Sequence, residues 1–189
     1  MITKNDLSVS DILLSTGSAG VSAAIRAGSG SRFSHTALYV GNGEIIEAIG
    51  QGVVRQPLAR AMSDDTLVSV YRRIRMSTAQ ANMVVRYAAM QIGKPYDSAG
   101  AAGAGATSFG RGGFITLFVS SIIPIVGYGL IAADINNRLN PEASFFCSEL
   151  VALAFDHANV SLGSGAASTT PGDISSAHVL NFIGNLKGA

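Results

Sequence analysis

One cysteine and three histidines are the residues of this chain best suited to nucleophilic and acid–base chemistry. Cys147 follows the aromatic pair Phe145 and Phe146 and opens a stretch whose apolar residues recur at helical spacing. A helix beginning near Cys147 would place the sulfur beside free backbone N–H groups and the positive end of the helix dipole, which favour a thiolate and stabilise an oxyanion. A lone cysteine is also consistent with a small buried hydrophobic residue, so the nucleophile interpretation depends on a partner base.

His35 is the histidine best placed to be that base, because it begins the apolar run 36–40, which predicts a strand that holds the ring rigidly. His157 falls too far along the predicted helix from Cys147, and His178 follows a Pro-Gly turn and is expected at the surface. A catalytic imidazole is usually oriented by a third group. Glu47 is the candidate, since it interrupts the apolar run 45–49, where a carboxylate is costly unless it is paired. The alternative is that both residues are structural. His35 would then be a hydrogen-bonded strand-edge histidine, and Glu47 an edge-strand charge that discourages aggregation.

The turn between the two strands decides whether His35 and Glu47 can meet. A two-residue turn would pair Leu38 with Glu47 and would place the two side chains on opposite faces of the sheet. A three-residue loop over 41–43, closed by a glycine bulge, pairs Ala37 with Glu47 and makes His35 and Glu47 diagonal neighbours on one face. We predict this second register.

Hydrophobic periodicity predicts the elements that carry these residues. Ser77 and Gln80 form a capping-box pattern ahead of a helical apolar period that stops at Gly93 and Pro95. Segment 16–31 is consistent with either a short helix or a loop. Short β-branched or apolar runs separated by turn residues predict an antiparallel sheet with strands at 11–15, 36–40, 44–49, 52–56 and 66–71. The fold expected is therefore α+β, with helices docked against this sheet.

An unusual insertion separates the two predicted helices. It is rich in Gly and Ala over 98–113 and carries no charge over 112–133, which is long enough to span a membrane. Because Pro124, Gly127 and Gly129 interrupt the uncharged run, we favour a packed helical cover over a membrane span. We expect a single domain over 1–189 with the insertion at 98–140.

Composition excludes several classes of function. Hydrophobic residues make up 48% of the chain and charged residues 13%, which excludes a disordered polymer, and a net charge of +1 argues against a nucleic-acid partner. One cysteine cannot form an internal disulfide or a four-cysteine zinc site, and we expect no cofactor. The polar N-terminus lacks the apolar stretch of a signal peptide, so we expect cytoplasmic synthesis without the Sec route, or export by a dedicated secretion system.

Four short motifs at 34–40, 45–48, 146–151 and 170–174 resemble the circularly permuted NlpC superfamily of papain-like proteins. Within it they are most similar to the YiiX-like branch, related to lecithin–retinol acyltransferase-like proteins. The runs 11–14 and 93–97 resemble the opening strand and the post-helix turn of the group, whereas the insertion departs from its pattern. The resemblance implies a papain-like fold with Cys147 as nucleophile, His35 as general base and Glu47 as the third polar member.

The activity implied by this resemblance is that of a cysteine hydrolase with a thioester intermediate. An amide bond in peptidoglycan peptide is the favoured substrate, and an exported antibacterial effector would also have an immunity or secretion partner. An acyl-lipid hydrolase or acyltransferase with membrane contact through 112–133 is the alternative. A non-catalytic lipid- or partner-binding module of the same fold is a further alternative from another class. A metal site built from Cys147, His35 and Glu47 ranks low, because the permuted papain order explains the three residues without a metal.

Overall fold

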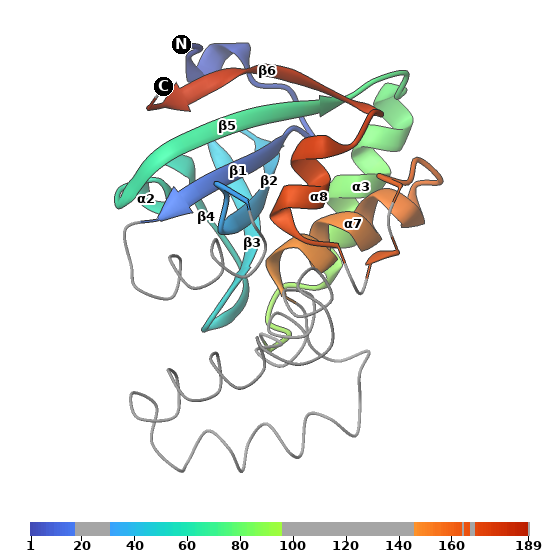
Figure 1. Cartoon of the computed structure of the whole chain (residues 1–189). Helices are drawn as coiled ribbons and strands as arrows, with labels where there is room; N and C mark the ends of the chain where they lie inside the picture. The colour runs from blue at the N-terminus through green and yellow to red at the C-terminus, as the bar shows by residue number, and fades with distance from the viewer. Residues whose placement is uncertain (18–30, 96–145, 164, 167–168, 189) are drawn as a thin grey trace, which may run out of the picture.

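Six antiparallel strands form one sheet in the order β4-β3-β2-β1-β5-β6 (Figure 1). The computed structural model describes residues 1–17, 31–95, 146–163, 165–166 and 169–188. All five predicted strands are present, and the sixth was not predicted. Their bounds are β1 Ile12–Gly17, β2 His35–Gly41, β3 Glu44–Ile49, β4 Gly52–Pro57, β5 Asp65–Arg73 and β6 Leu180–Lys187.

Three helices lie together on one side of this sheet (Figure 1). The predicted capping box is confirmed, since Ser77 accepts from the backbone N–H of Gln80 at the start of α3. The insertion at 98–140 lies outside the described residues, as does most of segment 16–31. The helices are α3 Thr78–Met90, α7 Cys147–His157 and α8 Pro171–Ser176, and two short turns, η1 Lys4–Asp6 and α2 Leu58–Ala61, complete the described elements.

Both faces of the sheet are buried, which explains why β1 is apolar without alternation. On one face, strand residues such as Leu38 and Ile46 pack with Val84 of α3 and with Leu150 and Phe155 of α7. The opposite face holds a second, smaller core, made of Leu13, Ala37, Tyr39, Ile45, Leu58, Val68 and Val70.

The hairpin of β2 and β3 has the predicted register, but a different turn produces it. Ala37 is paired with Glu47, as expected. The predicted three-residue loop is wrong: Asn42 and Gly43 form a two-residue turn, with φ of 54° and 74°, between the paired residues Gly41 and Glu44. Positive φ at both central positions suits the twist of a hairpin. The extra residue is absorbed as a bulge between Tyr39 and Gly41, which shifts the pairing by one.

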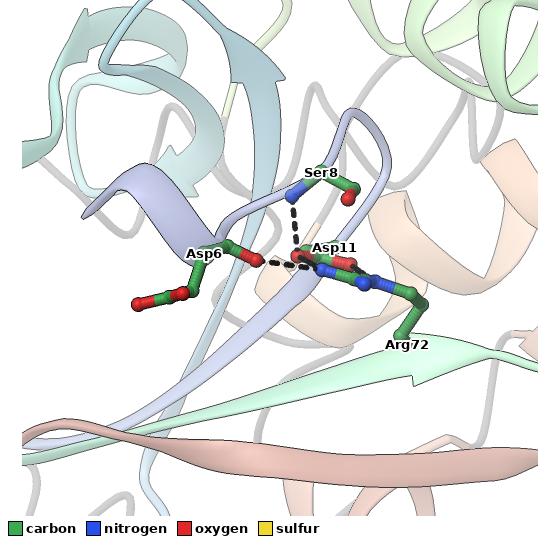
Figure 2. A network of polar contacts seen from close by, with 4 residues as sticks. All are labelled: Asp6, Ser8, Asp11 and Arg72. Atoms are coloured by element: carbon green, nitrogen blue, oxygen red, sulfur yellow. Dashed lines mark hydrogen bonds and ion pairs between the residues drawn. The ribbon is translucent and has the colours of Figure 1, made fainter. Parts of the chain in front are cut away.

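A buried carboxylate anchors the N-terminal segment to the middle of the sheet (Figure 2). Asp11 is fully buried, and Arg72 of β5 binds it through Nε and Nη2 at 2.7 and 2.8 Å. The Ser8 backbone N–H donates to the same carboxylate at 2.7 Å, and Arg72 also donates to the carbonyl of Asp6 at 2.9 Å. These bonds satisfy a charge that would otherwise be costly to bury.

Candidate active site

Cys147 is the first residue of α7, and its side chain is buried. The residue before it, Phe146, is extended and donates its backbone N–H to the carboxylate of Glu149 at 3.4 Å. The hydroxyl of Ser148 donates to the carbonyl of Thr169 at 2.6 Å, which ties the start of α7 to the segment that leads into α8. The sulfur therefore lies in a fixed first turn, where backbone N–H groups have no partner within the helix.

His35 connects the other two predicted site residues. Its ring hydrogen-bonds the Cys147 thiol, and its Nε2 lies 2.5 Å from Oε2 of Glu47. Because Nε2 is engaged by the carboxylate, Nδ1 is the ring nitrogen left for the sulfur. The His35 side chain is 27% exposed and that of Glu47 only 5%, so the carboxylate supports the ring from the protein side while the ring stays accessible. The structure thus brings together the three residues singled out in the sequence, while their catalytic roles stay predictions.

Gln56 is a site residue that the sequence analysis missed. Its Nε2 donates to Oε1 of Glu47, so both oxygens of the carboxylate are held. The register of β3 and β4 places Gln56 opposite Ile45, on the face that carries Glu47. A signal was available, because a two-residue turn over 50–51 pairs Ile49 with Gly52 and brings this polar residue beside Glu47.

The electrostatics of the site favour a thiolate paired with an imidazolium. Burial alone would raise the pKa of Cys147, but the hydrogen bond and charge of His35, together with the backbone N–H groups of Thr36 and Ser148, lower it. Burial likewise opposes the charged form of His35, yet Cys147 and then Glu47 raise the pKa of His35 well above 6.5.

The carboxylate of Glu47 keeps its charge despite being buried. Burial tends to raise the pKa of Glu47, but the hydrogen bond and charge of His35, followed by the hydrogen bond from Gln56, lower it overall. A negative Glu47 stabilises a positive His35, which in turn stabilises a negative sulfur. The arrangement can therefore deliver a nucleophile and a proton donor at the same place.

The two remaining histidines lie outside the site, as predicted. His157 ends α7 and stacks on Tyr87 with ring centroids 4.8 Å apart. His178 is exposed after α8.

Within the described parts of the chain, no three His, Cys, Asp or Glu side chains are grouped to hold a metal ion. The described helices also include none long and apolar enough to span a membrane.

Comparisons with known proteins identify a family and a fold. The family described as permuted papain-like amidase enzymes, YaeF/YiiX, C92, matches residues 6–100, which include His35, Glu47 and Gln56 but not Cys147. Among solved structures, the chain is similar to one described as the metalloprotein YiiX from Escherichia coli O157:H7, with a TM-score of 0.63 and 18% identity. That alignment covers 94% of this chain and 97% of the other. No curated protein matches the chain.

Proposed function

Since the chain belongs to the permuted papain-like amidase family C92, we propose that it is a cysteine amidase that forms a thioester on Cys147. The observation that carries this proposal is His35, which hydrogen-bonds the thiol on one side and Glu47 on the other. In a papain-like α+β fold this is the relation of nucleophile, base and orienting group.

The reaction begins with attack of the Cys147 thiolate on the carbonyl carbon of the substrate. The oxyanion that forms is stabilised at the start of α7, where the Cys147 backbone N–H is the donor nearest to the new bond. The His35 imidazolium then gives its proton to the leaving nitrogen, the C–N bond breaks, and a thioester remains. Water attacks the thioester, His35 accepts its proton, and the sulfur leaves as the acid product forms.

A peptide amide of bacterial peptidoglycan is the proposed substrate. The amidase description of the family supports amide chemistry, and the resemblance to NlpC-type proteins supports a cell-wall peptide. Export by a dedicated secretion system is one route to that substrate, and an immunity partner would then protect the producing cell.

An acyl-lipid substrate is the second candidate, favoured by the uncharged run 112–133. Such a run suits contact with acyl chains or a membrane surface, and it lies outside the described residues. In this case the same thioester would be an acyl enzyme, resolved by water in a hydrolase or by an amine or alcohol in a transferase.

The metal alternative fits this chain poorly. The structurally similar YiiX is described as a metalloprotein. Here, however, Cys147, His35 and Glu47 are arranged in series, with His35 hydrogen-bonded to each of the other two side chains. Donor atoms that bind one another do not converge on a single ion. We therefore expect chelators to leave the activity unchanged.

Purified peptidoglycan fragments and, separately, phospholipid vesicles test the proposal when products are read by mass spectrometry. New amine ends are expected from peptidoglycan, and the Cys147→Ala variant should lose at least about 10⁴-fold in kcat/KM because the nucleophile is gone. The control is Ser161→Ala, which alters an exposed residue after α7. Fatty acid release would instead support the lipid substrate. Full activity in Cys147→Ala would overturn the role of Cys147 as nucleophile. No product from either substrate with the unmodified chain would instead favour the non-catalytic binding module.

A further inference from the structure

A cavity of about 680 Å³ lies beside α8 and contains none of the three catalytic candidates. Its walls are α8, the neighbouring strands β5 and β6, and residues 31–33, which lead into β2. Figure 1 shows α8 packed on the helical side of the sheet below these two strands. The cavity is therefore a feature of the described fold that the proposed chemistry does not use.

The floor of this cavity is aromatic. Phe182 of β6 is 57% exposed, and its ring lies 5.5 Å from that of Tyr71 on β5, at an angle of 58°. Tyr71 in turn meets the buried Phe33 edge to face at 6.3 Å. A large aromatic side chain left exposed within a concave site is typical of a ligand-binding surface.

Arg32 provides a positive charge at the rim of the cavity. Arg32 lies with its guanidinium carbon 5.7 Å from the centre of the Phe33 ring, and it forms no ion pair with any described residue. The nearby carboxylate of Asp173 already accepts from the backbone N–H and hydroxyl of Thr170, at 2.8 and 2.6 Å. A guanidinium over an aromatic surface, unpaired with any carboxylate in the described parts of the chain, suits a planar anionic group from outside the chain.

Both walls of the cavity continue into the proposed active site. Phe33 is two positions before His35 in the sequence. On the other side, Gly172 of α8 lies so close to Ser31 that an added Cβ would be 2.9 Å from the Ser31 Cβ. The residue before the α8 cap, Thr169, accepts the hydrogen bond from Ser148, next to the nucleophile. A substrate held in the cavity would thus contact the segments that position both His35 and Cys147.

We infer that this cavity is a substrate subsite that binds a carboxylate-bearing part of the peptide beside the scissile amide. Arg32 pairs with the carboxylate, and the rings of Tyr71 and Phe182 contact the apolar part of the peptide. This inference rests on the proposed amidase function, but binding can be measured without turnover.

The test uses the full chain with Cys147→Ala, which binds without cleaving. Two synthetic Ala-γ-D-Glu-Lys peptides are titrated calorimetrically, one with the free α-carboxylate of glutamate and one with that group as the amide. We expect Arg32→Gln to weaken binding of the carboxylate peptide about tenfold and to leave the amide peptide nearly unchanged. Phe182→Ala should weaken both peptides alike, because it removes contact area and no charge. Arg86→Gln, at an exposed position of α3, is the matched control.

Three outcomes would overturn the subsite. The first is equal affinity of Arg32→Gln and its parent for the carboxylate peptide. The second is an equal loss in Arg86→Gln, which would show a general charge effect. The third is Arg32-dependent binding to phosphatidylglycerol vesicles without preference between the peptides, which would assign the cation to a lipid headgroup. Failure of catalysis alone would leave these binding results unaffected, so the two proposals can fail separately.

Discussion

At the scale of single residues, the site depends on a negatively charged Glu47, because this charge stabilises the protonated ring of His35. Gln56 holds the second carboxylate oxygen, so Gln56→Ala should raise the pKa of Glu47 and reduce its support for the imidazolium. We expect kcat/KM to fall about tenfold, with the alkaline limb of its pH profile moved to lower pH, since the pKa of His35 falls. Gln51→Ala, at an exposed position of the same hairpin, is the control. An unchanged profile in Gln56→Ala would show that Gln56 is only structural.

The pair of Cys147 and His35 predicts a specific pH dependence. His35 lowers the pKa of Cys147 from 9.0, and Cys147 and Glu47 raise the pKa of His35 well above 6.5, so both shifts favour a thiolate paired with an imidazolium. Activity should therefore fall toward acid as the thiolate is protonated, and toward alkali as His35 loses its proton. Alkylation with iodoacetamide, followed against pH, measures the thiolate directly. In the unmodified chain, alkylation should begin at a pH below the usual range for a thiol. In His35→Ala it should begin at a higher pH. If alkylation of the unmodified chain followed the pH profile of an ordinary thiol, this result would contradict the ion pair.

At the scale of elements, one glycine joins β4 to the turn after α3. Gly52 has φ of +105°, and an added Cβ would lie 2.5 Å from the carbonyl oxygen of Lys94. That carbonyl accepts the N–H of Val53 at 2.8 Å, and Gly93 donates back to Val53 at 2.9 Å. The close approach and the positive φ both require glycine at this position.

Gly52→Ala should lower the free energy of unfolding by at least about 2 kcal/mol, because the backbone strain and the clash act together. Urea denaturation measures the loss. The matched control is Gly50→Ala in the same hairpin, where an added Cβ meets nothing within 4 Å, and its effect should stay within about 0.5 kcal/mol. Equal stability of the two variants would show that the turn after α3 moves freely relative to β4.

At the scale of the whole molecule, the bond between Asp11 and Arg72 holds the N-terminal segment, β1 and β5 together (Figure 2). Asp11→Ala would leave the Arg72 guanidinium and the Ser8 N–H without their common acceptor. We expect a loss of about 2 kcal/mol in the free energy of unfolding, because an N–H group and a guanidinium that is 36% exposed lose a charged acceptor.

The exposed pair of Arg55 and Glu44 is the natural comparison for this prediction. Their side chains are 45% and 35% exposed, whereas that of Asp11 is fully buried. Arg55→Ala should therefore change the stability by less than about 1 kcal/mol. Thermal and urea unfolding of both variants check the ranking, and a similar loss in the two would contradict the role of burial.

Local patterns in the sequence determined most of the elements and the chemical types at the site. Helical spacing after Cys147 and the capping residues of α3 act within a few residues, so they can be read from the chain alone. The same holds for the alternation that placed His35 and Glu47 on one face. Their roles as base and orienting group stay predictions until activity is measured.

Only the tertiary structure decided the features that depend on distant pairing. β6 carries Asn181, Gly184 and Asn185 and has no clear alternation, so its place at the edge follows from pairing with β5. The bulge in β2 was not predicted either, because turn preference and register compete over the same few residues. The contact of Gln56 with Glu47, the pairing of Arg72 with Asp11 and the aromatic cavity beside α8 all join separate strands or helices. Such contacts exist only after the chain has folded, because the residues that form them are not neighbours in any local pattern.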